Sequence, residues 1–301
     1  MELSDAVFKF EYDGEDFTIP LDNGRFTLRG CEWRPEGQPD FVVVYVHGLG
    51  SFLTTKHDVI DVILQNGGAF LGCDHLGHGR SPGPRCSCTI EEICEETEQV
   101  IVKARESFPD IPIFLFSHSM GSLASIRLIF EKSIFVSQNL RGAIIESPWI
   151  SNSREHPVGF LDSFFLMIAA KYWPYMIINT GDEPYSPDTQ QDFVRKVISS
   201  PLFSPFSTPR LLNSAFHSIT FVRENYSDWP SDLPVIFLQG GKDTDVNPLE
   251  NLAWFKDVQE SSAKDTVEYK FYPDASHNLL KTVFRPVVLQ DILDFINNHK
   301  Q

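Results

Sequence analysis

A serine that could act as a nucleophile, Ser119, lies at the centre of the stretch Ser117-His118-Ser119-Met120-Gly121. The apolar run 113–116 precedes this stretch, and the helix-like run 123–130 follows it. A strand, a tight turn with a central serine and then a helix are typical of a nucleophile elbow, in which the helix start offers free backbone N–H groups. The usual elbow begins with glycine; here Ser117, which is also small, takes that place.

A serine hydroxyl is a poor nucleophile alone, so this interpretation requires a histidine base and an acid. His277 lies in a polar loop after a predicted strand, where its ring can reach a group at another strand end. Asp243, in the Gly-rich loop after the strand predicted at 235–238, is the preferred acid, because it gives the chain order Ser, Asp, His. Asp245 in the same loop and Glu146 after an earlier strand are alternatives for the acid.

A second Gly-rich turn, His47-Gly48-Leu49-Gly50, follows the predicted strand 41–46. A turn at this place can bring the Leu49 N–H beside the Met120 N–H, and two such donors form an oxyanion hole. The function expected of His47 is to hold the loop rather than to act as base.

The pair His75 and His78 has a spacing that suits metal ligands on a helix. Two glycines and Pro82 make this segment a loop, which favours structural hydrogen bonding, so no metal and no cofactor are expected. The five cysteines form no zinc or disulfide pattern, and the acidic N-terminus has no apolar signal segment. These features predict a cytoplasmic protein, and the aromatic residues of the inserted segment described below predict that it can act peripherally at membranes.

The elements that must position these residues alternate along most of the chain. Strands are predicted at 7–10, 17–19, 26–33, 41–46, 69–73, 113–116, 143–145, 235–238 and 266–272, and helices at 58–64, 90–108, 120–130, 249–258 and 286–298. All-apolar strands that alternate with helices are typical of a mainly parallel sheet with helices on both faces. The fold class is therefore α/β, and ligands of such sheets bind at the carboxyl edge of the strands.

The alternation is interrupted by a helical, Pro-rich and aromatic segment. We expect residues 1–150 and 231–301 to form the core domain and residues 151–230 to form a cap, or lid, inserted into it. The cap aromatic residues Phe164, Phe165 and Trp173, with Trp149 just before the cap, are predicted to bind an acyl chain or to contact a membrane surface transiently. For most of these aromatic residues, packing inside the cap is the competing interpretation.

The charge balance excludes one class of partner. The 301 residues include 25 Lys and Arg against 41 Asp and Glu, which gives a net charge of −16. Such a chain repels nucleic acid, so no nucleic acid partner is expected. The oligomeric state cannot be read from the sequence.

The chain resembles the monoacylglycerol lipase and lysophospholipase group of α/β-hydrolases. The likeness runs from about Phe26 to the C-terminus and is strongest at 47–50, 74–81, 117–121, 239–243 and 272–277. It implies the α/β-hydrolase fold, the catalytic triad Ser119, Asp243 and His277, and oxyanion donors at Leu49 and Met120.

The resemblance implies a serine hydrolase that cleaves carboxylic esters of single-chain acyl lipids, a monoacylglycerol or a lysophospholipid, through an acyl-enzyme. One alternative is a peptidase or amidase of the same fold, which the acidic cap residues Asp182, Glu183 and Asp188 leave open. The other is a non-catalytic binding protein, which would normally lack one of the three triad residues.

Overall fold

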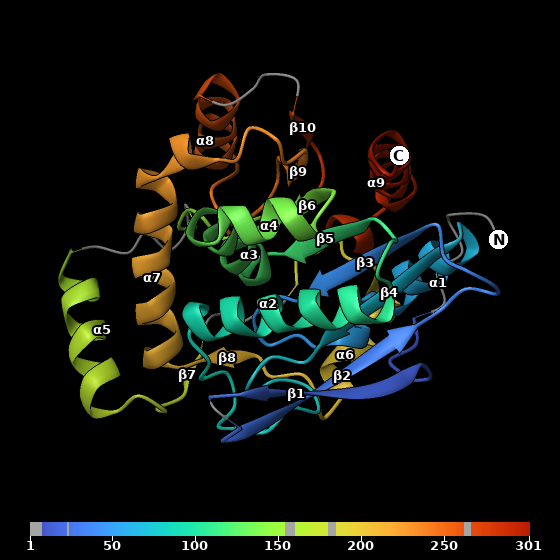
Figure 1. The fold of residues 1–301 in the computed structure, drawn as a ribbon. Helices are drawn as coiled ribbons and strands as arrows, with labels where there is room; N and C mark the ends of the chain where they lie inside the picture. Colours follow the sequence, from blue (N-terminus) through green and yellow to red (C-terminus); the bar gives the residue numbers. More distant parts are fainter. Residues whose placement is uncertain (1–7, 23, 154–159, 180–184, 262–265) are drawn as a thin grey trace.

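An eight-stranded sheet runs through the centre of the molecule (Figure 1). The computed structural model describes residues 8–22, 24–153, 160–179, 185–261 and 266–301. In spatial order the strands are β1 (Glu15–Leu21), β2 (Phe26–Trp33), β4 (Gly68–Cys73), β3 (Phe41–Val46), β5 (Ile113–His118), β6 (Gly142–Glu146), β9 (Val235–Gly240) and β10 (Val267–Tyr272). Strand β2 is antiparallel to both of its neighbours, and the strands from β4 to β10 pair in parallel.

Helices surround this sheet. They are α1 (His57–Gln65), α2 (Ile90–Ser107), α3 (Met120–Glu131), α4 (Ser133–Asn139), α5 (Phe160–Tyr172), α6 (Gln191–Ser199), α7 (Pro209–Glu224), α8 (Pro248–Ser261) and α9 (Arg285–His299). Short 3-10 helices are η1 (Leu53–Lys56), η2 (Tyr226–Asp228) and η3 (Leu279–Lys281), and β7 (Ile178–Asn179) pairs with β8 (Phe206–Ser207).

The period-two alternation of strand side chains divides the core into two layers. In β3, Val42 and Val44 belong to the apolar cluster that includes residues of α2, α3 and α8. Their neighbours Val43 and Tyr45 belong to the cluster that includes residues of α1 and α9. A strand buried on both faces must be apolar throughout, which explains the uninterrupted Phe41–Val46 sequence.

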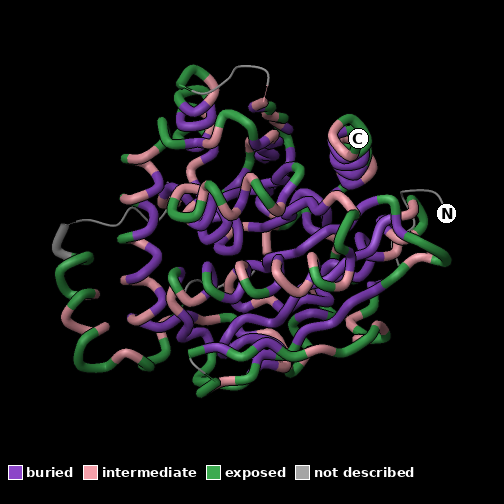
Figure 2. The backbone as a smooth tube through the Cα atoms, in the orientation of Figure 1, coloured by how far each residue is buried: buried purple, intermediate pink, exposed green. Residues whose placement is uncertain are grey.

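The segment between β6 and β9 has two parts with different surroundings. Helix α7 packs on α2 and α3, and its buried residues Leu211, Ala215 and Val222 join the core cluster. Helix α5 stands outside α7, at the left edge of Figure 1, and much of its surface is exposed in Figure 2. In the described part of this segment, α7 is thus packed on the core helices and α5 forms an outer layer on α7, while α6 packs separately against Phe8 and Phe52.

The predicted strands and helices of the sheet region are confirmed to within a few residues, except at two places. Residues 8–10 of the first predicted strand do not pair with the sheet. Phe8 and Phe10 pack instead against Phe193 of α6, and Phe10 also packs against Phe52. The alternating apolar residues here are therefore explained by contact with a helix and not by strand pairing. The short helix α4 was not predicted. Among the described helices, none is long and apolar enough to cross a membrane.

Candidate active site

Ser119 lies between β5 and α3 in a strained backbone conformation. Its φ is 54° and its ψ is −116°, a region that non-glycine residues rarely adopt. Such strain persists only where the surrounding structure enforces it, and it is concentrated at functional sites. The Ser119 N–H donates to Glu146 O at 3.0 Å, and the Trp149 N–H donates to Ser119 O at 3.1 Å. The turn is thus fixed from the neighbouring strand end.

Small residues on either side allow this turn. A Cβ on Gly121 would lie 2.3 Å from Val46 O, so no larger residue fits where α3 begins against the end of β3. Ser117, at the place of the usual glycine, is fully buried and accepts a hydrogen bond from Ser122 Oγ at 3.1 Å. The serine hydroxyl therefore fits in the elbow with its polar atom satisfied.

His277 and Asp243 come together from the loops after β10 and β9. His277 Nδ1 lies 2.8 Å from Asp243 Oδ2, and both side chains are buried. Burial lowers the pKa of His277, but the charges of Asp243 and Asp245 outweigh burial and raise the pKa to about 9. A carboxylate on Nδ1 fixes the ring orientation and leaves Nε2 for proton transfer.

Further hydrogen bonds hold this pair. Asp243 Oδ2 accepts from Gln239 Nε2 at 2.9 Å, and its Oδ1 accepts from the backbone N–H groups of Asp245 and Val246. Ser147 Oγ donates to His277 O at 2.8 Å. These contacts of Gln239 and Ser147 were not expected from the sequence, where the only signal is that each is a polar residue at the end of a buried strand.

The two alternative acids have other positions. Glu146 accepts from Lys56 Nζ at 2.7 Å in a buried ion pair. Asp245 lies on the other side of the His277 ring, with its Oδ2 3.7 Å from Nε2. Asp243 is therefore the carboxylate that bonds to Nδ1.

The loop that carries Leu49 lies against the nucleophile. A Cβ on Gly48 would come within 3.2 Å of Ser119 Cβ. In the described residues, neither the Leu49 N–H nor the Met120 N–H has a hydrogen-bond acceptor. An oxyanion hole needs two such donors, and its formation by Leu49 and Met120 stays a prediction.

His47 and His75 keep this loop in place, as expected for His47. His47 Nδ1 lies 2.9 Å from Gly48 O, and its Nε2 accepts from the His75 N–H at 3.1 Å. These contacts require a neutral ring with the proton on Nδ1, and burial lowers the pKa of His47 well below its usual range. His47 is thus a structural residue of the loop.

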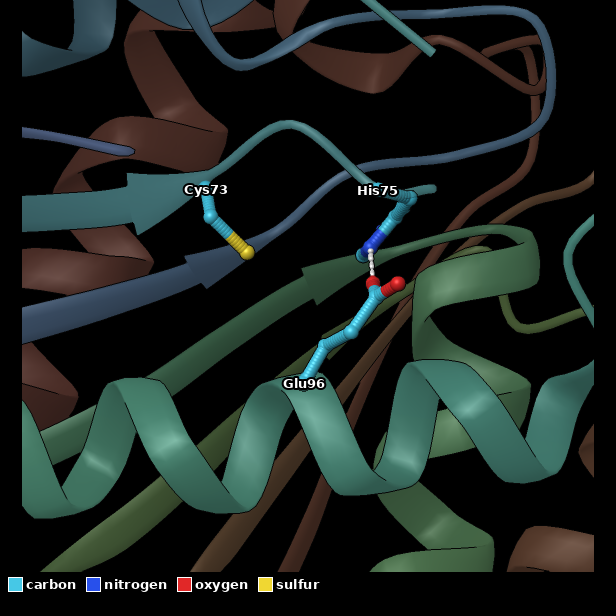
Figure 3. Close-up of side chains that lie close together, drawn as sticks. All are labelled: Cys73, His75 and Glu96. Atoms are coloured by element: carbon cyan, nitrogen blue, oxygen red, sulfur yellow. Dashed lines mark hydrogen bonds and ion pairs between the residues drawn. The ribbon is translucent and has the colours of Figure 1, made fainter. Parts of the chain in front are cut away.

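Cys73, His75 and Glu96 form a buried group of atoms that could bind a metal ion (Figure 3). The atoms that would bind a metal ion already make other contacts within the protein. His75 Nδ1 lies 2.6 Å from Glu96 Oε2, and His75 Nε2 lies 3.1 Å from His47 O. Burial raises the pKa of the Cys73 thiol, so Cys73 stays protonated. Both nitrogens of His75 therefore face oxygen acceptors, and its contact with the His47 carbonyl helps to hold the loop that carries Leu49.

The four predicted substrate-binding aromatic residues lie in two places. Trp149 is partly buried against the core cluster and bonds to Ser119 O through its backbone. Phe164, Phe165 and Trp173, in or just after α5, have 46%, 63% and 61% of their surface exposed. Only Trp149 is thus brought beside the triad by a hydrogen bond; acyl-chain binding by these residues stays a prediction.

The chain is similar in sequence to known proteins over most of its length. The sequence model of the family described as serine aminopeptidase, S33, matches residues 37–282. Mouse monoglyceride lipase is 26% identical over 148 residues, which cover 49% of this chain and 46% of that protein, so the match spans about half of the relative. Caffeoylshikimate esterase of Arabidopsis thaliana is 24% identical over 274 residues, covering 87% of this chain and 79% of the relative.

Solved structures show the same architecture. A soluble variant of monoglyceride lipase from Saccharomyces cerevisiae, in complex with a substrate analog, aligns with a TM-score of 0.81 at 18% identity. The alignment covers 98% of this chain and all of that one. The α/β-hydrolase fold expected from the sequence is confirmed.

Proposed function

Because the chain belongs to the serine aminopeptidase S33 family of α/β-hydrolases, we propose that it is a serine hydrolase that cleaves carboxylic esters of single-chain acyl lipids. The observation that carries this proposal is the strained Ser119 turn beside the His277–Asp243 pair. The names of the relatives agree with ester hydrolysis, because both the mouse lipase and the plant esterase are enzymes of this class.

The proposed reaction is a two-step acyl transfer. Ser119 Oγ attacks the ester carbonyl while His277 Nε2 takes its proton, and Asp243 stabilises the imidazolium that forms. The Leu49 and Met120 N–H groups donate to the oxyanion. His277 then protonates the leaving alcohol, and water releases the acid from the acyl-enzyme by the reverse route.

A single-chain lipid is favoured by the apolar surface of the inserted segment. We take residues 151–230 as the cap of the core formed by 1–150 and 231–301. Phe164 and Phe165 on α5 and Trp173 after it offer exposed aromatic surface, and such side chains insert readily into the boundary of a lipid layer. The proposal therefore includes transient contact of α5 with the surface that presents the substrate.

The family description also favours a second function, cleavage of an amide next to an amine. Such an enzyme would use the same triad and an acidic group to bind the amine. Asp182 and Glu183 of the cap lie outside the described residues, and Asp188 accepts a hydrogen bond from the Ser276 N–H at 3.2 Å. Asp188 thus touches the loop that carries His277, where a substrate amine would be close to the reacting bond.

Hydrolysis of a matched panel tests the proposal. The panel contains a long-chain monoacylglycerol, a lysophosphatidylcholine, a short soluble ester and an aminoacyl amide, each with wild type and with Ser119→Ala. We expect long-chain single-tail esters to be cleaved by wild type alone. Faster cleavage of the short ester would contradict the lipid substrate, and cleavage of the amide alone would favour the peptidase. Full activity of Ser119→Ala would contradict the assignment of the nucleophile.

A further inference from the structure

The imidazole of His277 lies between two carboxylates. Asp243 Oδ2 is 2.8 Å from Nδ1, and Asp245 Oδ2 is 3.7 Å from Nε2. The acid of a triad occupies only Nδ1, because Nε2 must face the serine. In this chain a second carboxylate, with about half of its side chain exposed, faces the nitrogen that receives the Ser119 proton.

We propose that Asp245 is a positioning residue that holds His277 as the imidazolium in the resting enzyme and so moves hydrolysis to alkaline pH. The proposal rests on the proposed function of Ser119 and His277. An imidazolium carries hydrogens on both nitrogens and has no lone pair for the serine proton. Before each turnover, His277 must therefore release the Nε2 proton to solvent, and only the neutral ring can then accept the proton of Ser119.

The position of Ser119 agrees with this arrangement. In the described residues, Ser119 Oγ has no hydrogen-bond partner, although its hydroxyl is expected to bond to Nε2 in an active triad. Coulomb attraction between an imidazolium and a carboxylate at this distance is substantial even at a partly exposed site. Asp245 and Ser119 thus compete for the same nitrogen, and the charged ring favours Asp245.

The other charged groups around His277 do not replace Asp245. Glu146, at the end of β6, adds to the negative potential, but its carboxylate is paired with Lys56 at 2.7 Å. His118, whose ring centroid is 5.0 Å from that of His277, stays neutral because burial lowers its pKa well below the usual range. The pKa of about 9 for His277 therefore depends mainly on Asp243 and Asp245, which outweigh the effect of burial.

The test is the pH profile of kcat/KM from pH 6 to 10 for wild type, Asp245→Asn and Asp274→Asn. The wild-type profile should rise with a midpoint near pH 9, because the neutral ring forms above its pKa. Loss of one carboxylate charge should lower the midpoint by about one pH unit and raise kcat/KM at pH 7 about five- to tenfold, with convergence at high pH. Asp274 is the matched control, since it lies three residues before His277 but pairs with Lys242 at 2.7 Å. Its variant should follow wild type.

Direct titration separates this inference from the proposed function. The imidazole signal of His277, identified by NMR through its loss in His277→Gln, should titrate at a lower pH in Asp245→Asn even if no tested ester is a substrate. An unchanged titration midpoint in Asp245→Asn would overturn the inference, and so would equal shifts in Asp245→Asn and Asp274→Asn. A lower midpoint together with inactivity on every ester would support the inference and contradict the proposed function.

Discussion

At the scale of single residues, Gly50 shows how closely the loop 47–50, which carries the proposed oxyanion donor Leu49, depends on its neighbours. Its φ is +67°, and a Cβ at this position would lie 2.2 Å from Ser204 O. The Ser204 N–H also donates to Gly50 O at 3.0 Å. The segment before β8 therefore fixes the loop that carries Leu49, and only glycine fits between the two.

We predict that Gly50→Ala lowers kcat by about 10- to 100-fold, because displacement of the loop weakens one oxyanion donor, whose loss is typically worth about 10²–10³ in rate. Steady-state kinetics on the preferred ester would measure this. Gly37→Ala is the matched control, because Gly37 also has a positive φ, +93°, but a Cβ there meets no atom within 4 Å. Equal losses in both variants would show that backbone strain, and not the contact with Ser204, causes the effect.

Much of the candidate site could be predicted residue by residue. Ser119, Asp243 and His277 each follow a predicted strand, and parallel strands bring their carboxyl ends to the same edge of the sheet. The approach of Asp245 to Nε2 could not be predicted, because it depends on the path of a loop two residues beyond the acid. The contact of His75 with the His47 carbonyl also could not be predicted, because it joins two loops that are 28 residues apart in the sequence.

At the scale of elements, the buried pair of Lys56 and Glu146 joins η1 to the end of β6. Their side chains are 4% and 0% exposed, and the pair lies directly behind the Ser119 turn, whose N–H bonds to Glu146 O. A buried charge that loses its partner is strongly destabilising, whereas two well-packed apolar residues can replace a buried pair at little cost.

We predict that Glu146→Leu lowers the free energy of unfolding by about 3–5 kcal/mol, because it leaves the Lys56 charge buried without its partner. The double variant Lys56→Met/Glu146→Leu should recover most of this loss. Urea unfolding would measure the free energy of unfolding of both variants. The control is Asp274→Asn, which removes an exposed ion pair and is expected to change this free energy by less than about 1 kcal/mol. A cost of Glu146→Leu as small as that of Asp274→Asn would contradict this account.

The predicted elements were accurate where periodicity and burial agree. The apolar runs 41–46, 113–116 and 235–238 form the central strands β3, β5 and β9, as predicted. Thr89 and Glu92 form the capping box expected at the start of α2. The prediction was wrong at residues 8–10, because an alternating apolar pattern does not tell whether the partner is a strand or a helix such as α6. Helix α4, just before β6, was missed because only Val136 is buried in it, so its sequence has little of the apolar periodicity that predicts a helix.

At the scale of the whole molecule, a net charge of −16 is combined with an exposed aromatic face on α5. Apolar side chains favour a lipid surface, while like charges repel an anionic one over about 10 Å at 0.1 M salt. Together these two effects predict that the protein prefers zwitterionic over anionic lipid surfaces, a preference that depends on neither the triad nor the core.

We predict that long-chain substrate in zwitterionic vesicles is cleaved several-fold faster than the same substrate in anionic vesicles at low salt, and that salt reduces the difference. Rates with both vesicle types at two ionic strengths would measure this. Phe165→Ser/Trp173→Ser should slow cleavage in vesicles but leave that of a soluble short ester unchanged. Equal loss on both substrates would contradict a surface function of α5.

The most direct test of the central claim, that Ser119 is an activated nucleophile, is covalent labelling with a long-chain fluorophosphonate followed by peptide mass mapping. We expect one adduct per chain, on the peptide that contains Ser119, and no adduct in Ser119→Ala. Labelling should become faster as the pH rises toward about 9. An adduct on another residue, or undiminished labelling of Ser119→Ala, would contradict the claim.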